Sequence, residues 1–334
     1  MKICVIGAGA IGGLLAARLA RAGESVSVIA RGATLAAVRA NGLTLIEEDG
    51  ESFSVELAAT DQMQDLGAQD LVILGMKAHQ VSAVVGDLSK LCHPETMVIP
   101  AQNGIPWWYF HKHGGALEGR RLESVDPGGV IADHLSPDRV VATVVYPAAE
   151  ILRPGVIRHI EGRRFSLAEL DGARTARVER ISQTMQGAGF KAPTVSDIRS
   201  EIWTKLWGNL SFNPISALTH ATLEDICRDR AARALAAEIM REAQRVGEAL
   251  GVRFRIPLEK RIAGAEAVGA HKTSMLQDVE RGAPLEIDAL LGAVLELGAM
   301  TGVATPACQN IYALIKLLNK TILGRRGRLR IESI

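Results

Sequence analysis

The first thirteen residues contain the pattern that most constrains the fold of this chain. Ile3 to Ile6 is a continuous apolar run, as expected of a strand buried on both faces of a parallel sheet. It leads into a G-x-G-x-x-G turn at the point where a helix must begin, made of Gly7, Ala8, Gly9, Ala10, Ile11 and Gly12. The glycines permit a tight turn, the approach of a pyrophosphate to the backbone, and close packing of helix on strand. Because strand, turn and helix follow in the required order, the pattern predicts dinucleotide binding at the helix N-terminus rather than a bare structural turn.

The end of the second strand indicates which dinucleotide is bound. Val26 to Ile29 is apolar and is followed by Ala30 and Arg31. Sites that prefer NAD usually place Asp or Glu here, where the carboxylate accepts hydrogen bonds from the ribose 2′-hydroxyl. The missing carboxylate and the added guanidinium, which can pair with a 2′-phosphate, predict NADP(H).

Two further apolar runs are predicted as buried strands, Asp70 to Leu74 and Thr96 to Ile99. Lys77 follows the first of them and Asn103 the second. Ligands of such sheets bind beyond the carboxyl ends of the strands, so both side chains are expected beside cofactor and substrate. A solvated loop lysine and a turn asparagine are the simpler interpretations of each residue alone, and their shared placement favours a site.

The chain changes character near residue 172. Before that point it reads as α/β, with a hairpin or short strands over Asn41 to Leu57 and strands at Val140 to Tyr146, Val156 to Ile160 and Phe165 to Leu170. Beyond it, helical patterns replace strands. We therefore expect a Rossmann-type dinucleotide-binding domain at 1–172, followed by an all-α domain at 173–334, which fits the two domains that 334 residues suggest.

One helix of the second half carries a polar stripe. It is expected to start after Asp197 and to run through Leu210, with Pro214 kinking or interrupting it. Lys205, Asn209 and Asn213 recur every four residues along one side. Such a stripe is usually a wet face, but Trp203 and Trp207 beside it favour a helix wedged between domains. Further helices are predicted at 230–250, 258–268, 285–300, with Pro284 in the first turn, and 307–323.

Composition excludes several classes of function. The formal net charge is +1, which gives no basis for nucleic-acid binding, and no apolar stretch is long enough to span a membrane. Four widely spaced cysteines suggest neither a disulfide framework nor a zinc site, so a reducing cytoplasm fits. His111 and His113 lack a third ligand at a suitable spacing and are interpreted as a surface pair, so we expect no metal.

Taken together, these motifs resemble the ketopantoate reductase family (2-dehydropantoate 2-reductase) over nearly the whole chain. The matching pieces are Gly7-x-Gly9-x-x-Gly12, Arg31, Lys77-Ala-His-Gln80, Gln102-Asn-Gly104, Trp203-x-Lys205-x-x-x-Asn209-x-x-x-Asn213-Pro214, Ser274-Met-Leu-Gln-Asp278 and Glu286-Ile-Asp288. The resemblance implies a Rossmann domain, a helical domain and an active site in the cleft between them. It also implies NADPH-dependent reduction of 2-dehydropantoate to (R)-pantoate, on the way to pantothenate and coenzyme A.

The resemblance assigns roles residue by residue. Lys205 matches the proton donor, and Glu286 matches the glutamate that engages the substrate hydroxyl and the lysine. Substrate binding is implied for Asn103, Asn209, Asn213 and Ser274; cofactor binding is implied for Gly7, Gly9, Ala10, Ile11, Gly12, Arg31, Lys77 and Asn103. A ketone that accepts hydride develops negative charge on oxygen, and a lysine is suited to neutralise and protonate that oxygen.

The chain departs from the family pattern near the expected substrate position. Trp107, Trp108, His271 and Leu291 stand where smaller or more polar residues are expected. A paralogue that reduces another 2-oxo acid or ketone is therefore an alternative, as is a non-catalytic NADPH-binding regulator. Retention of Lys205 disfavours the regulator. A small 2-oxo acid is the expected partner, and an exposed apolar helical face would favour a homodimer.

Overall fold

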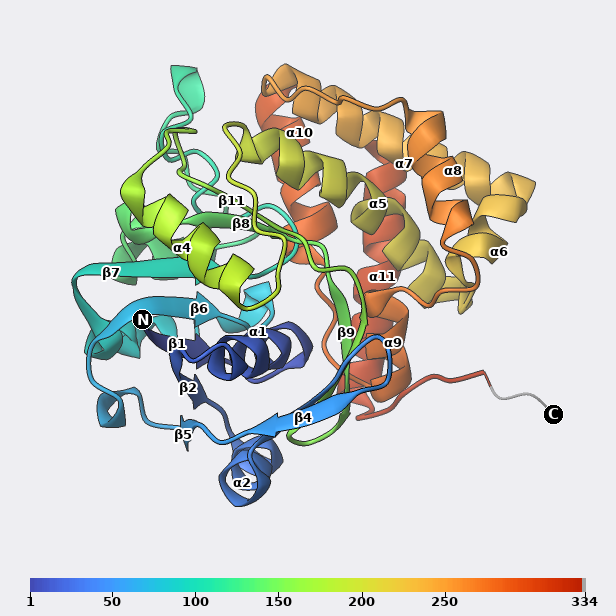
Figure 1. The fold of residues 1–334 in the computed structure, drawn as a ribbon. Coiled ribbons are helices and arrows are strands. Elements are labelled where there is room, and N and C mark those ends of the chain that lie inside the picture. Colours follow the sequence, from blue (N-terminus) through green and yellow to red (C-terminus); the bar gives the residue numbers. More distant parts are fainter. Residues whose placement is uncertain (332–334) are drawn as a thin grey trace. The chain divides into compact units, whose positions relative to one another are not determined.

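The computed structural model describes residues 1–331, which form two compact units. The first unit comprises 1–102, 107–121 and 128–198, and the second comprises 103–106, 122–127 and the chain from Arg199 onward. The predicted domain 173–334 thus begins within the first unit, and its last three residues lie outside the described part. Figure 1 shows the course of the chain through the elements named below.

A five-stranded parallel sheet, in the order β5-β2-β1-β6-β7, is the frame of the first unit. Its strands are β1 (Lys2–Ile6), β2 (Ser25–Ile29), β5 (Ala58–Thr60), β6 (Gln69–Leu74) and β7 (Cys92–Pro100). Alternate residues of β1 enter different cores: Ile3 and Val5 pack on one face, and Cys4 and Ile6 on the other. This burial of both faces explains why the strands read as continuous apolar runs.

Helix α1 (Ala10–Arg21) lies between the parallel sheet and a smaller sheet of order β4-β3-β10-β9. The smaller sheet contains β3 (Leu43–Ile46), β4 (Ser52–Val55), β9 (Ala148–Arg153) and β10 (Val156–Glu161). The predicted hairpin is the antiparallel pair of β3 and β4. The unit is completed by β8 (Ala142–Val145) paired with β11 (Phe165–Ala168), and by helices α2 (Gly32–Asn41), α3 (Val130–His134) and α4 (Ala176–Gly187).

A buried charge cluster ties the smaller sheet to α1. Arg18 of α1 forms an ion pair with Glu47, which follows β3, and its guanidinium lies 3.3 Å from Nδ1 of His159 on β10. Arg18 is 5% exposed and His159 is 1% exposed. Burial disfavours the charged form of Glu47, but the hydrogen bonds and charges of Arg18 and His159 outweigh it and lower the pKa of this carboxyl.

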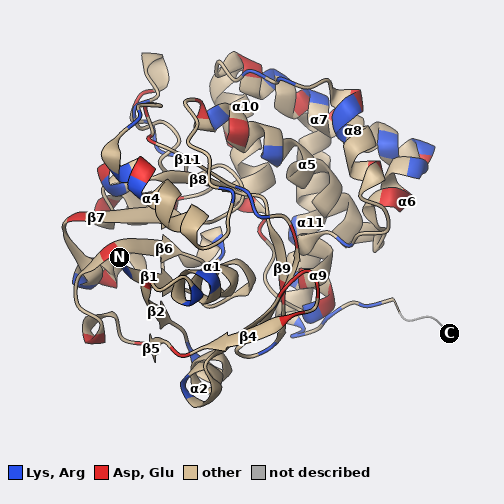
Figure 2. Cartoon of the chain, viewed as in Figure 1, with Lys and Arg blue, Asp and Glu red and all other residues tan. Residues whose placement is uncertain are grey.

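The second unit is helical in its regular structure, and the predicted fold class, a Rossmann-type α/β unit followed by an all-α unit, is confirmed. Its α-helices are α5 (Ile198–Thr219), α6 (Leu223–Arg228), α7 (Arg230–Ala249), α8 (Leu258–Ala267), α9 (Ser274–Arg281), α10 (Ala293–Thr301) and α11 (Pro306–Gly324). In α7 and α8 acidic and basic residues are interspersed (Figure 2).

Two helical predictions are wrong at their boundaries. The helix that starts after Asp197 does not end at Leu210 but continues through Pro214 to Thr219. It is anchored by buried residues on both sides of the proline, with Phe212 before it and Ile215 after it, so tertiary packing outweighs the lost backbone hydrogen bond. The helix expected to begin at Leu285 begins instead with a π-helical turn at Asp288–Gly292, so Glu286 precedes it.

Candidate active site

The glycine turn has the tight packing that its spacing predicts. Gly7 follows β1 with φ +95°, and a Cβ on Gly12 would lie 2.0 Å from the carbonyl oxygen of Gly7. Gly75, which follows β6, completes the contact, because a Cβ there would lie 2.7 Å from Cα of Gly12. Our sequence interpretation gave Gly75 no role, although its position directly after a buried strand was a usable signal. Only glycine fits at these close approaches.

The start of α1 offers backbone donors to an anion. Gly9 is the N-cap and provides no side chain, and the first backbone hydrogen bond runs from the Gly13 N–H to the Gly9 carbonyl at 2.7 Å. Within residues 1–331 the N–H groups of Ala10, Ile11 and Gly12 have no acceptor. A phosphate at a helix N-terminus is stabilised by such donors and by the helix dipole, so these residues fit a pyrophosphate.

Arg31 and Lys77 stand at the same edge of the sheet as this turn, because β2 and β6 run parallel to β1 on either side of it. Arg31 is exposed at the N-cap position of α2, and no carboxylate in the described chain pairs with it. Lys77 begins a short 3₁₀ turn in which its backbone N–H donates to Oε1 of Gln80 at 3.1 Å. An uncommitted guanidinium at the end of β2 fits a 2′-phosphate.

A second cluster brings together three predicted residues of the helical unit. Nζ of Lys205, on α5, donates to Oδ1 of Asn103 at 2.5 Å. Burial lowers the pKa of Lys205 to about 8, and the charge of Glu286 opposes this shift. The cluster therefore holds a lysine that is still largely protonated at neutral pH and that can release its proton near that pH, as a general acid requires.

Two of the other predicted substrate residues lie on the same helix as Lys205, and the third lies on α9. Asn209 and Asn213 follow Lys205 by one and two turns on the same side of α5; Asn209 is half-buried and Asn213 is buried. Ser274 is exposed at the first position of α9, after the N-cap Thr273. The cluster lies in the helical unit, whereas the glycine turn, Arg31 and Lys77 lie in the α/β unit.

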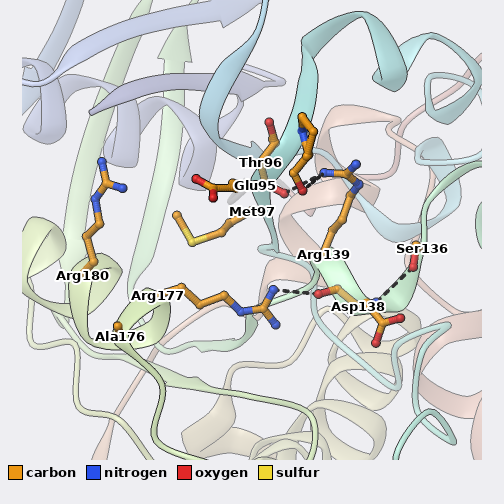
Figure 3. Close-up of a pocket in the computed structure, with 10 residues that line it drawn as sticks. Glu95, Thr96, Met97, Ser136, Asp138, Arg139, Ala176, Arg177 and Arg180 are labelled. Carbon is orange, nitrogen blue, oxygen red and sulfur yellow. Dashed lines mark hydrogen bonds between the residues drawn. The ribbon is translucent and has the colours of Figure 1, made fainter.

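A cavity of about 630 Å³ lies elsewhere in the α/β unit, along the first half of β7 and beside α4 (Figure 3). That half of β7 is the amino end of the strand, so the cavity lies away from the carboxyl edge that carries the glycine turn. Arg139 donates to the carbonyls of His93, Pro94 and Thr96, and Arg177 is engaged by Glu169 and the Asp138 carbonyl. The guanidinium groups of these two arginines are bound by other groups of the protein, so we assign the cavity no ligand.

The residues that depart from the family pattern are largely structural. Trp108 is 2% exposed, Leu291 is fully buried, and Trp107 packs against the core on the β1–β6–β7 face. His271 lies in the loop before α9, where its carbonyl accepts from the Leu223 N–H at 3.0 Å. Trp107 and His271 are partly exposed, so of these four residues they are the two whose side chains can contact a ligand.

The two histidines that invited a metal interpretation have other partners. Nε2 of His111 lies 3.0 Å from Oδ1 of Asp138, and Nδ1 of His113 lies 2.9 Å from the carbonyl oxygen of Gly114. Among residues 1–331 no group of three His, Cys, Asp or Glu side chains is arranged to hold a metal ion. No helix in the same range is long and apolar enough to cross a membrane.

Comparison with known proteins assigns both halves of the chain. Residues 3–172 match the family model described as "Ketopantoate reductase PanE/ApbA", and residues 197–319 match its C-terminal counterpart, "Ketopantoate reductase PanE/ApbA C terminal". A 2-dehydropantoate 2-reductase of Mesorhizobium japonicum is 55% identical over 319 residues, which are 95% of this chain and 98% of that protein.

Solved structures agree with this assignment. A protein of Ralstonia solanacearum MolK2, provisionally named a ketopantoate reductase, superposes with a TM-score of 0.92 and 41% identity over 97% of this chain and 98% of its own. A D-mandelate dehydrogenase solved with NADH and anilino(oxo)acetate gives a TM-score of 0.82 at 22% identity over 96% and 99%, which shows a shared fold. With matching family models over most of its length and a close curated relative, this chain belongs to the ketopantoate reductase family.

Proposed function

We propose that this enzyme reduces 2-dehydropantoate to (R)-pantoate with NADPH, in the formation of pantothenate and coenzyme A. The observation that carries the proposal is the hydrogen bond between Lys205 and Asn103, with Glu286 acting electrostatically on the same lysine. Family membership and the name of the M. japonicum relative support the same reaction.

In this mechanism Lys205 acts on the carbonyl oxygen of the substrate. Bound NADPH supplies the hydride, and negative charge then develops on that oxygen. The Lys205 ammonium first polarises the carbonyl and then donates the proton. Asn103 fixes the direction of the ammonium through its Oδ1 acceptor, so that little reorganisation is needed during the reaction.

Glu286 has two roles in the proposal. It accepts a hydrogen bond from the substrate hydroxyl, and its charge keeps the half-buried lysine more basic than burial alone would allow. Asn209, Asn213 and Ser274 bind the polar groups of the substrate, with Ser274 directed at its carboxylate. A hydroxylated 2-oxo acid supplies partners for all of these groups, whereas a less polar ketone leaves some unpaired.

The α/β part, residues 1–172, is proposed to hold the cofactor, and 173–334 the substrate. The pyrophosphate would rest on Gly7, Gly9, Ala10, Ile11 and Gly12, with Arg31 on the 2′-phosphate and Lys77 and Asn103 toward the nicotinamide. These residues fit the group because, among residues 1–331, the N–H groups at the start of α1 have no acceptor and the Arg31 guanidinium has no carboxylate partner.

We further propose a cytoplasmic homodimer that acts on a small molecule, without a nucleic-acid or membrane partner. The formal net charge of +1 gives no electrostatic drive toward nucleic acid. Leu314 and Leu317 of α11 are 55% and 62% exposed and supply the apolar helical face that a second copy could cover.

The test is turnover with a panel of 2-oxo acids. Ketopantoate should give the highest kcat/KM with NADPH, and Lys205→Ala should lower kcat by about 10²–10⁴-fold while folding and NADPH affinity persist. Lys260→Ala, an exposed lysine of α8, is the matched control and should behave as wild type. Faster reduction of another 2-oxo acid would identify a paralogue; absence of any turnover, with NADPH still bound, would identify a regulator.

A further inference from the structure

The helix that follows Glu286 begins irregularly, and this irregularity has a definite consequence for hydrogen bonding. At Asp288–Gly292 the backbone forms a π-helical turn, in which the Ala293 N–H bonds to the Asp288 carbonyl. In a regular α-helix that N–H would bond to the Ala289 carbonyl. The π turn therefore takes away the usual donor to the Ala289 carbonyl. Such turns are rare in proteins, and those that occur are often found at functional sites.

The Ala289 carbonyl is used by the loop that carries Asn103. It accepts the Ile105 N–H at 2.8 Å. Gly104, which lies between Asn103 and Ile105 in the chain, has φ +92°, and a Cβ on it would lie 2.3 Å from the same carbonyl oxygen. The loop backbone therefore lies so close to the π turn that only glycine fits at residue 104. Asn103 directly precedes Gly104, so this contact sets where its side chain meets Lys205.

Helix α11 fixes the same turn from another side. The carboxylate of Asp288 accepts from Oη of Tyr312 at 2.7 Å and from Nζ of Lys316 at 3.1 Å. One turn beyond Lys316, Oδ1 of Asn319 accepts the N–H of Leu285 at 3.1 Å. Glu286 thus lies in a segment that α11 holds at the residue before it and at the second residue after it.

We propose that Tyr312 and Asn319 are positioning residues for the reductase reaction: from α11 they hold segment 285–289, and so set Glu286 and, through the Ala289 carbonyl, Asn103 against Lys205. Neither acts on the substrate itself. The inference rests on the proposed function for the role of Lys205, although the positioning itself is independent of which substrate is reduced.

The test uses the full-length enzyme with Tyr312→Phe, Asn319→Ala and the double variant. Tyr312→Phe keeps the ring and removes only the hydroxyl that bonds Asp288. Thr321→Ala is the matched control, since the Thr321 hydroxyl is exposed on the same helix and donates to the Leu317 carbonyl, one turn earlier in that helix. We expect kcat to fall about tenfold in the double variant, NADPH affinity to stay within about twofold, and the control to match wild type.

A second readout follows Lys205 without any substrate. Brief modification with acetic anhydride across pH, read by peptide mass spectrometry, gives the midpoint at which its amine becomes reactive. Looser placement of Glu286 weakens its charge effect on the lysine, so the midpoint should move about half a pH unit lower. Asp288→Asn keeps an acceptor for Tyr312 and should shift the midpoint less than the double variant.

Separate results decide the two proposals. If wild type reduces no 2-oxo acid, the proposed function fails, and the reactivity midpoint still decides the positioning role. If the double variant is folded, and both its midpoint and its turnover per folded molecule equal those of wild type, Tyr312 and Asn319 have no positioning role. A double variant that differs from wild type only in a lower melting temperature would likewise show that Tyr312 and Asn319 have no positioning role.

Discussion

The pH dependence of reduction gives the sharpest test of Lys205. An ordinary lysine has a pKa of 10.5 and would remain protonated through pH 9, whereas burial lowers the pKa of Lys205 to about 8. If the protonated amine is the reactive form, about 90% of the enzyme is competent at pH 7 and roughly 10% at pH 9. The value of kcat/KM should therefore fall by about tenfold between these two pH values.

Glu286→Gln sharpens the test, because the Glu286 charge raises the pKa of Lys205 against the effect of burial. Removing that charge should lower the pKa further, so the alkaline fall should begin at lower pH in the variant. The assay is NADPH oxidation under limiting ketopantoate, with 4-deuterated NADPH to establish that hydride transfer limits the rate. A wild-type profile that stays flat to pH 9.5, or a Glu286→Gln profile displaced to higher pH, would refute the assignment of Lys205 as proton donor.

Three further predictions concern the α/β unit. Arg31→Ala should weaken NADPH by about 1.5–3 kcal/mol and leave NADH nearly unchanged in fluorescence titrations; equal losses would remove Arg31 from the 2′-phosphate. Gly12→Ala places a methyl group 2.0 Å from the Gly7 carbonyl oxygen, so NADPH affinity should drop at least tenfold, and normal affinity would mean that the turn can relax. Glu47→Gln removes the carboxylate partner of buried Arg18 but leaves its contacts with His159 and the Gly189 carbonyl, so the cost should be about 3 kcal/mol near pH 7. Because folding lowers the pKa of Glu47, this contribution is present above about pH 4.5 and disappears on further acidification, so urea midpoints of the two proteins should converge in acid and not at neutral pH.

The elements predicted well from sequence are those fixed by local constraints. The glycine turn, the strands Lys2–Ile6 and Gln69–Leu74, and helix Arg230–Ala249 follow from residue spacing and burial on one or both faces. Edge strand β9 was not predicted, because Ala148–Arg153 is largely exposed toward its end and carries no clear alternation.

The features that were missed depend on contacts between distant residues. A π turn adds one residue to a helix whose apolar pattern remains nearly intact, so Asp288–Gly292 could not be separated from a regular start. Gly104 resembled an ordinary turn glycine until its approach to the Ala289 carbonyl was known. The hydrogen bond between Asn103 and Lys205 joins residues 102 positions apart. Family resemblance assigned both residues to one site, but the sequence did not predict that they bond to each other.

Two short segments of the α/β sequence belong to the helical unit, and this limits where the chain can be joined to that of another family member in a chimera. Residues 103–106 and 122–127 interrupt the α/β sequence yet belong to the second unit, where the carboxylate of Glu296 accepts the N–H groups of Glu123 and Ser124, both at 2.8 Å. A chimera joined at a single point near residue 198 would exchange Lys205 while keeping the host's own Asn103 loop. Exchange of substrate preference between family members therefore calls for three grafted segments, and libraries built by single crossover should be poor in active clones.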